Sequence, residues 1–288
     1  MNDLNNNSNF DNESLNTVFH PSDFSKASEI AFAHALKLTI AANANLELFH
    51  VTQDSHSSNV DHFPSVRRTL EQWKVLPAGS TSSQVADLGI SIKKKIVSSS
   101  DTVRSVLHQL EKNHSDLIVL ATHQRDGISH ILHKAVAEPV SRQSEIMTLF
   151  VPHGTEGFVS LKDGNINLRN ILIPIAHNPD PQLAVDTAST LMNILEPEEP
   201  TFTLLHVGDE SNLPKAKTYT KKNLTWKTVI TKGNIVDQIL SMEKEHSTDL
   251  IVMTTQGHVG LMDNFRGSTT EKILRNSNCP VLAVPVKQ

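Results

Sequence analysis

A segment near the C-terminal end of the chain has the residues needed to hold a phosphate group. Thr254 ends an apolar run, Gly257 follows it, and after nine intervening residues comes Gly267-Ser268-Thr269. A glycine after a strand lets the backbone approach a ligand, and a serine three residues before a glutamate is typical of a helix cap. Free amides at a helix N-terminus favour phosphate oxygens. The spacing therefore predicts nucleotide or phosphate binding, with a plain turn and helix cap as the alternative.

A second candidate is Asp23, which follows an apolar run that ends at Pro21. Its carboxylate could contact a ligand, or it and the serines beside it could simply cap the helix that we expect to begin there. His50 and His206 lie at the ends of two similar runs. We expect both imidazoles to be satisfied by hydrogen bonds at the end of a sheet, and neither to be catalytic.

The sequence predicts neither a catalytic set nor a metal site. The candidate loop has no lysine-bearing phosphate loop of the Walker type, and we find no paired carboxylates and no defensible Ser/His/Asp order. His258 or Asp263 could assist a water. His123, His130 and His133 lie in one segment, but no cysteine or clear carboxylate completes the three or four ligands that zinc requires. We expect these histidines to lie on a polar surface.

The chain is a tandem repeat, because four sequence motifs return in the same order in its second half. Internal repeats of this kind indicate a duplicated structural unit. The paired segments, first copy against second, are Thr17–Pro21 and Ile171–Pro174, Leu46–Val51 and Phe202–Val207, Glu111–Leu120 and Glu243–Met253, and Ile146–Pro152 and Cys279–Pro285.

Each copy alternates largely apolar strands with helical patterns, which indicates a parallel sheet covered on both faces. The predicted fold class is α/β, with two tandem doubly wound, Rossmann-like parallel-sheet domains. After the first strand of each copy we expect helices over 27–38 and 182–194, strands over 46–51 and 202–207, strands over 90–97 and 226–231, helices over 102–113 and 235–245, strands over 117–121 and 250–254, a last helix, and closing strands over 146–151 and 281–286.

The repeat sets the domain boundaries. We expect a disordered Asn-rich tail over 1–15, a first domain over 16–152, a connector over 153–168 and a second domain over 169–288. Asp163-Gly164 lies between alternating apolar residues, which is typical of a type I′ hairpin turn. The connector is therefore expected to be a small hairpin that fixes the two domains against each other.

Composition excludes several classes of protein. The formal net charge of the 288 residues is −5, and no extended Lys/Arg block provides the footprint of a nucleic-acid binder. The lysines of Ile92–Ile96 fit a strand with one solvated face. No apolar run approaches the roughly 20 residues that span a bilayer, and residues 1–15 lack the features of a signal peptide. With Cys279 as the single cysteine, no intrachain disulfide is possible. We expect a cytoplasmic protein.

The repeat and the candidate loop together resemble the universal stress protein family, whose domains have an adenine nucleotide alpha hydrolase-like fold. In that family a Gly-x2-Gly-x9-Gly-(Ser/Thr) motif wraps the ribose and phosphates of ATP. This sequence has Thr254 at the first glycine, while Gly257, Gly267 and Ser268 match the others. Val207 matches a family position whose backbone lies near adenine.

The first copy departs from the same motif. Its four positions are occupied by Ala121, Gln124, Lys134 and Ala135. The segment Pro21–Ser25, however, resembles a family signature, Pro-Thr-Asp-Phe-Ser, whose aspartate contacts adenine. The matching position in the second copy is Ala176. Each copy therefore keeps one part of the family's site and has lost the other.

The resemblance implies a cytoplasmic stress-response protein that binds adenine nucleotide, ATP with or without Mg²⁺, in its second domain. Such a protein would act as a regulatory or interaction module, and we expect binding rather than catalysis. A nucleotide-free scaffold for protein partners and a slow nucleotide hydrolase are the alternatives. The family also pairs domains through closing strands, here Ile146–Val151 and Val281–Val286. The two halves could form that pseudo-dimer within one chain, and two chains could also associate as a homodimer.

Overall fold

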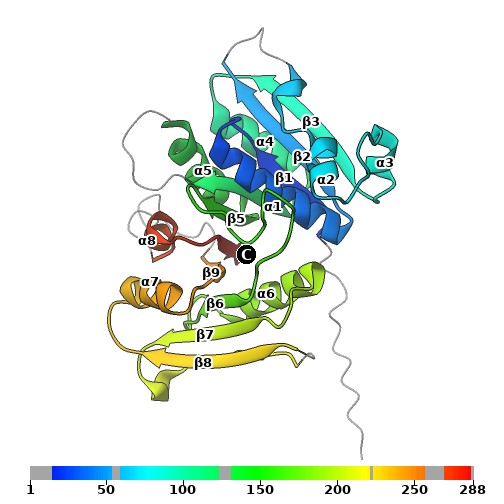
Figure 1. Ribbon diagram of the computed structural model, residues 1–288. Coiled ribbons are helices and arrows are strands. Elements are labelled where there is room, and N and C mark those ends of the chain that lie inside the picture. The colour runs from blue at the N-terminus through cyan, green and yellow to red at the C-terminus, as the bar shows by residue number, and fades with distance from the viewer. Residues whose placement is uncertain (1–14, 54–58, 123–130, 221–222, 257–268, 287–288) are drawn as a thin grey trace, which may run out of the picture.

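The two halves of the chain form one ten-stranded sheet, whose strands follow the order β3-β2-β1-β4-β5-β10-β9-β6-β7-β8. The computed structural model describes residues 15–53, 59–122, 131–220, 223–256 and 269–286. In Figure 1 the first half lies above the second, and the sheet extends from β3 at one edge to β8 at the other. The α/β fold class expected from the repeat is confirmed.

The first half follows the expected alternation. Parallel pairing joins β1 to β2 and β4, β2 to β3, and β4 to β5. Three short helical turns between β2 and β3 were not expected. The elements are β1 (Thr17–Pro21), α1 (Lys26–Ala42), β2 (Asn45–Thr52), η1 (Val60–His62), α2 (Val66–Gln72), α3 (Ser82–Ala86), β3 (Ser91–Ser98), α4 (Thr102–Asn113), β4 (Leu117–Thr122), α5 (Ile131–Ser144) and β5 (Met147–Pro152).

The second half repeats this order without the extra helices, apart from one 3-10 turn. Its strands are again paired in parallel. The elements are β6 (Asn170–Pro174), α6 (Gln182–Leu195), β7 (Thr201–Val207), η2 (Glu210–Asn212), β8 (Thr225–Thr231), α7 (Ile235–Glu245), β9 (Leu250–Thr255), α8 (Thr269–Asn276) and β10 (Val281–Pro285).

The closing strands join the halves. β5 pairs antiparallel with β10, with Phe150 opposite Val281 and Leu149 opposite Leu282. Both strands are almost entirely buried, and they lie at the centre of the molecule in Figure 1. Each would be an edge strand of its own half, so the antiparallel pairing covers two apolar edges at once. The pairing of closing strands inferred from the sequence is therefore present within one chain.

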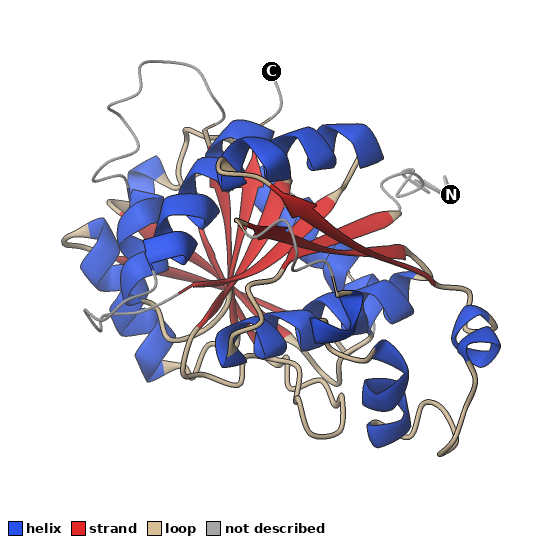
Figure 2. Ribbon diagram, turned by 90° about the horizontal axis from the view of Figure 1, so that it is seen from above, coloured by secondary structure: helices blue, strands red, loops and turns tan. Residues whose placement is uncertain are grey.

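The two faces of the sheet are covered differently. On one face α1 and α6 pack over a single hydrophobic core that continues from the first half into the second, through Phe158, Val159 and Leu168 of the connector. On the other face the first half has a separate core beneath α4 and α5, and the second half has one beneath α7 and α8. Figure 2 shows helices on both sides of the sheet. The shared core fixes the halves against each other on the α1/α6 face.

The connector forms a hairpin-like loop with one antiparallel bridge, between Val159 and Ile166. The expected two-residue type I′ turn at Asp163-Gly164 is wrong. Gly164, with a φ of +69°, donates its N–H to the carbonyl of Ser160 at 2.8 Å, so the turn is longer. A Cβ on Gly164 would lie 2.4 Å from the Trp73 ring. The close approach of this ring selects the turn, which no local sequence signal reveals.

A buried histidine of α1 also holds the connector. His34 is fully buried and donates from Nδ1 to the carbonyl of Ile30 at 2.9 Å. Its Nε2 accepts the backbone N–H groups of Phe158 at 3.1 Å and Val159 at 3.2 Å. Burial lowers the pKa of His34 to about 4. The neutral ring is required, because a protonated Nε2 could accept neither bond.

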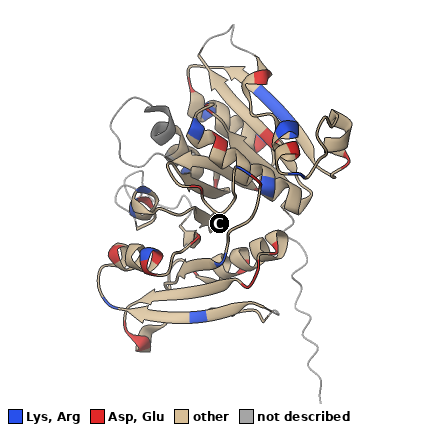
Figure 3. Ribbon diagram, in the orientation of Figure 1, with Lys and Arg blue, Asp and Glu red and all other residues tan. Residues whose placement is uncertain are grey.

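Charged residues of both signs are distributed over the two halves (Figure 3). The lysine-rich run lies on the edge strand β3, where Lys95 donates to the side chain of Gln109 at 2.6 Å. Lys94 is partly buried, which lowers its pKa. In the described ranges, none of the helices has the length and apolar character that crossing a bilayer requires.

Candidate nucleotide site at the strand ends

The predicted site residues fall into two separate places. Val207 ends β7, Thr254 lies near the end of β9, and Thr269 begins α8, so these three belong to the second half. Strands β7 and β9 flank β6. Asp23 follows β1 in the first half. The remaining members of the predicted loop, Gly257, Gly267 and Ser268, lie outside the described residues, as do His258 and Asp263.

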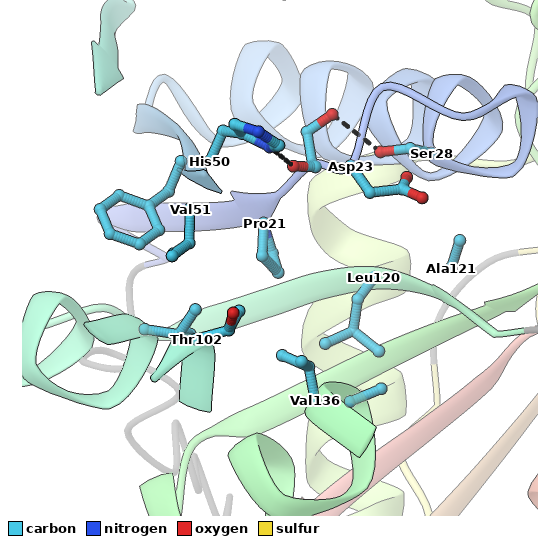
Figure 4. A pocket seen from close by; sticks show the side chains of 13 residues that line it. Pro21, Asp23, Ser28, His50, Val51, Thr102, Leu120, Ala121 and Val136 are labelled. Atoms are coloured by element: carbon cyan, nitrogen blue, oxygen red, sulfur yellow. Dashed lines mark hydrogen bonds between the residues drawn. The ribbon is translucent and has the colours of Figure 1, made fainter. Parts of the chain in front are cut away.

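The first half has a small cavity where its strands end. About 60 Å³ is enclosed between the ends of β1, β2 and β4 and the helices α4 and α5. Figure 4 shows Asp23, Ser28 and His50 on one side of it and Leu120 and Val136 on the other. This volume holds a few waters, whereas pockets for small organic ligands measure roughly 300–1,000 Å³. As it stands, the cavity is too small for a nucleotide.

Asp23 supports the start of α1. The N-cap of that helix is Ser25, whose hydroxyl accepts the N–H of Ser28 at 3.2 Å. The carboxylate of Asp23 accepts from both the N–H of Ser25, at 3.1 Å, and its hydroxyl, at 2.7 Å. This geometry fits the helix-capping alternative, in which Asp23 orients the residue that caps the helix.

Phe24 fills the space above the first-half strand ends. Its backbone has a φ of +64°, a left-handed conformation that is uncommon for an aromatic residue. The ring lies against His50 with centroids 4.1 Å apart and meets Phe63 edge-on at 5.1 Å. Stacking of this kind offsets the backbone strain. The first half thus covers its strand ends with its own side chains.

Polar groups beneath Phe24 are all paired. His50 donates from Nδ1 to the carbonyl of Ser22 at 2.7 Å, as expected from the sequence. Fully buried His20 donates to the carbonyl of Val119 at 2.8 Å and accepts from the hydroxyl of Ser28 at 3.2 Å, which lies 2.9 Å from the hydroxyl of Ser22. Burial lowers the pKa of His20 to about 4. This connected network pairs both ring nitrogens of His20 and the hydroxyls of Ser22 and Ser28 within the protein.

At the strand ends of the second half, by contrast, several buried polar atoms have no hydrogen-bond partner among the described residues. Among the described residues, neither ring nitrogen of His206 has a hydrogen-bond partner, although the residue is only 6% exposed. The expectation that hydrogen bonds satisfy His206 is therefore wrong. The hydroxyls of Thr231 and Thr254 are likewise buried and unpartnered within this part of the chain. Buried polar atoms without partners are rare in native proteins and call for an explanation.

The repeat shows what these positions hold when no ligand is needed. His50 pairs with the residue before Val97, and His206 pairs with the residue before Thr231. Thr231 is therefore the equivalent of Val97. The order within β4 and β9 makes Thr254 the equivalent of Ala121. Both first-half residues are apolar. The second half has therefore placed hydroxyls where the fold accepts a methyl or isopropyl group.

The second half also lacks the aromatic cover. Ala176 stands at the position of Asp23, and His177 at that of Phe24. His177 lies within hydrogen-bond distance of the backbone and side-chain oxygens of Asn212, at 3.1 and 3.0 Å, instead of stacking on its neighbouring histidine. The end of β6 thus has a methyl group at Ala176, and the neighbouring strands β7 and β9 have the unpartnered atoms of His206 and Thr254.

Sequence reasoning missed Thr231 and misjudged His206. A signal for Thr231 existed, because the aligned copies show a polar residue replacing an apolar one at a strand end. For His206 no such signal exists, since both copies have histidine. In the described ranges, no three His, Cys, Asp or Glu side chains form a metal-binding group. The side chains of His123, His130 and His133 are not among those described.

Known proteins match this chain in both sequence and fold. A model of the universal stress protein family matches residues 16–152 and 216–285. A universal stress protein of Methanocaldococcus jannaschii is 37% identical over 57 residues, which is 20% of this chain and 34% of that relative, so the match spans about a third of its length.

Two solved structures share the whole architecture. A universal stress protein from Archaeoglobus fulgidus has a TM-score of 0.61 at 18% identity, covering 94% of this chain and 98% of the other. A functionally unknown protein from Pseudomonas aeruginosa has a TM-score of 0.59 at 10% identity, covering 94% and 93%. Identities this low establish the fold alone. Since the family model matches more than half of the residues, in two regions that fall in the two halves of the sheet, the chain belongs to the universal stress protein family, as a tandem of two family units.

Proposed function

We propose that the second half binds an adenine nucleotide and that the protein acts as a stress-response regulatory or interaction module. The site lies over the end of β6, between Val207 and His206 on one side and Thr254 on the other. The nucleotide phosphates would lie on the segment from Gly257 to Ser268 and on Thr269, which opens α8. Mg²⁺ would accompany the phosphates as a counter-charge.

The observation that carries the proposal is the group of unpartnered atoms at these strand ends. His206, Thr231 and Thr254 each bury a polar atom without a partner in the described residues, and each such atom costs about 1–3 kcal/mol. A bound nucleotide has hydroxyls, ring nitrogens and phosphate oxygens that can satisfy them. Ligands of open α/β sheets bind at this edge, outside the carboxyl ends of the strands.

The first half supports the same assignment by contrast. Its cavity is small, the side chains of His20, Ser22 and Ser28 are paired with one another or with the backbone, and Phe24 stacks on His50. The motif that the family uses for phosphates is also absent from its sequence, at Ala121, Gln124, Lys134 and Ala135. We infer that the first half has a structural or regulatory role and that Asp23 acts there as part of a helix cap.

Thermal unfolding with millimolar ATP, ADP and cyclic AMP, each with and without Mg²⁺, tests the proposal. A ligand at about 100 times its Kd stabilises by about 2.7 kcal/mol, which raises the Tm by several degrees in a chain of this size. We expect Gly267→Val to abolish the shift, because a branched side chain would obstruct the phosphates, while Asp23→Ala keeps it.

Other outcomes identify the alternatives. No shift with any nucleotide would leave the nucleotide-free scaffold as the function. Loss of the shift in Asp23→Ala but not in Gly267→Val would place the site in the first half. Product analysis after prolonged incubation with ATP then distinguishes binding from slow hydrolysis.

A further inference from the structure

His50 and His206 occupy equivalent positions, yet the two halves use them differently. His50 donates to the carbonyl of Ser22 at 2.7 Å and stacks under Phe24. His206 is more deeply buried than His50, yet within the described residues neither its Nδ1 nor its Nε2 has a partner. The first half proves that this fold can satisfy a histidine at this position. The unpartnered ring of His206 is therefore a property of the second site and not of the architecture.

A glycine permits the difference. A Cβ on Gly208 would lie 2.6 Å from Nε2 of His206 and 3.0 Å from its Cε1, closer than real Cβ contacts allow. The equivalent residue of the first half is Thr52, which has a Cβ at that place. The backbone φ of Gly208 lies outside the left-handed region that favours glycine. A glycine is therefore required at position 208 because any side chain there would collide with the His206 ring.

The groups that would compete with His206 are also gone from the second half. Ala176 replaces the carboxylate of Asp23, and His177 is held by Asn212 at 3.0 Å instead of covering the ring as Phe24 does. His206 and Thr231 come from adjacent strands, because Val207 pairs with Thr231 in the parallel ladder. Both flank Val207, whose equivalent in the family lies near adenine. Thr231 shares the sheet face of Val207, and His206 lies on the opposite face.

We propose that His206, oriented by the space at Gly208, reads the base of the nucleotide in the second half and lets the site accept 6-amino and 6-oxo purines alike. This inference rests on the proposed nucleotide site. Its chemistry follows from the hydrogen-bonding groups. A carboxylate only accepts, so it favours the 6-amino group of adenine, whereas a neutral imidazole offers one donor and one acceptor and a threonine hydroxyl offers both.

Two consequences follow. No described residue holds either nitrogen of His206, so either tautomer is open to the ligand. A purine with an amino group at position 6 and one with a carbonyl there can each be satisfied. The Ala176 position decides the selectivity, because a carboxylate placed there would add an acceptor beside position 6, where a 6-oxo purine has no donor.

Titration calorimetry of the full chain with ATP and with inosine triphosphate tests the proposal. We expect the wild-type Kd values to agree within about 3-fold. His206→Leu should weaken both nucleotides about 10-fold, the equivalent of one hydrogen bond. Ala176→Asp should restore a preference for ATP of about 10-fold or more. Gly208→Ala should weaken both nucleotides as much as His206→Leu does. The variant retains the imidazole of His206, but the added methyl group displaces it.

The matched control is His50→Leu. It should lower the Tm by about 5 °C, since it removes a hydrogen bond and a stacking contact, and leave both Kd values unchanged. His206→Leu should not lower the Tm without nucleotide, because it replaces an unpartnered buried ring with an apolar side chain. Gly208→Ala tests the same role with the imidazole retained.

The outcomes separate the two proposals. If neither nucleotide binds the wild-type chain, the proposed function fails and the reading of the base fails with it. If ATP binds but inosine triphosphate is at least 10-fold weaker, or if His206→Leu and Gly208→Ala bind as the wild type does, the nucleotide site stands and the role of His206 is refuted.

Discussion

The two halves of the sheet have the same architecture and opposite chemistry at their strand ends. In the first, His50 is paired and stacks against Phe24, and Val97 and Ala121 are apolar. In the second, His206, Thr231 and Thr254 bury polar atoms that have no partner in the described chain. At these equivalent positions, the first copy has paired or apolar side chains and the second has unpaired polar atoms, although the first copy also buries an unpartnered hydroxyl at Thr122.

This difference teaches how a duplicated domain can divide its tasks. Stability needs paired polar groups, while binding needs groups that stay unpaired until a ligand arrives. The groups around His20 and His50 meet the first requirement, and the first half also holds the connector through His34 and Trp73. The groups around His206 meet the second requirement, and the shared core beneath α1 and α6 joins the two halves.

The largest expected effect is an acid sensitivity that originates in the first half. His20 and His34 are neutral when folded, with pKa values lowered to about 4 by burial, against an ordinary value near 6.5. Below pH 6.5 the unfolded chain binds more protons than the folded one. The stability that these rings contribute is complete above pH 6.5 and is lost as the pH falls toward 4, at about 1.4 kcal/mol per unit for each ring.

Urea unfolding between pH 7 and pH 4 measures this loss. Each histidine should account for roughly 3 kcal/mol over the window. His34→Gln keeps an acceptor for the N–H groups of Phe158 and Val159 but does not titrate, so it should flatten the pH dependence by about half. The second half has Ile173 at the position of His20. An unchanged pH slope in His34→Gln would exclude this source of the sensitivity.

A smaller effect is expected from the aromatic cover. Phe24→Ala removes the contacts with His50 and Phe63 and should lower the free energy of unfolding by about 2 kcal/mol, less than for a fully buried phenylalanine. His177→Ala, at the equivalent position, should change it by less than about 0.5 kcal/mol because the side chain is exposed. Denaturant unfolding of the pair measures the contrast. Equal losses in both variants would show that the second half is covered as well.

The smallest effect is expected from exchanging one pair of equivalent residues. Thr254→Val removes an unpartnered hydroxyl and should leave stability unchanged or raise it by up to about 1 kcal/mol. Ala121→Thr buries a new hydroxyl among apolar neighbours and should lower stability by about 1–2 kcal/mol. Thermal unfolding without nucleotide makes the comparison. A loss of stability in Thr254→Val would mean that its hydroxyl is already satisfied.

Much of the fold could be predicted from the repeat. The helices over 102–113 and 235–245 have the expected bounds, and the strand expected over 202–207 begins one residue earlier, because apolar runs and helix caps are local signals that both copies share. The turn at Gly164 could not be predicted, since the ring of Trp73, far away in sequence, determines its shape. The short helices α2 and α3 lie in the stretch where the copies have no common pattern.

By itself, the sequence determined the duplication, the order of strands and helices, and the chemical types of the residues at each strand end. These follow from periodicity and from comparing the copies. Only the tertiary structure decided which of those residues have partners. His50 and His206 are the same residue at the same position, and their difference depends on Phe24, Ser22 and Gly208. Whether a polar atom is satisfied is a property of its neighbours in space, which a single residue type cannot reveal.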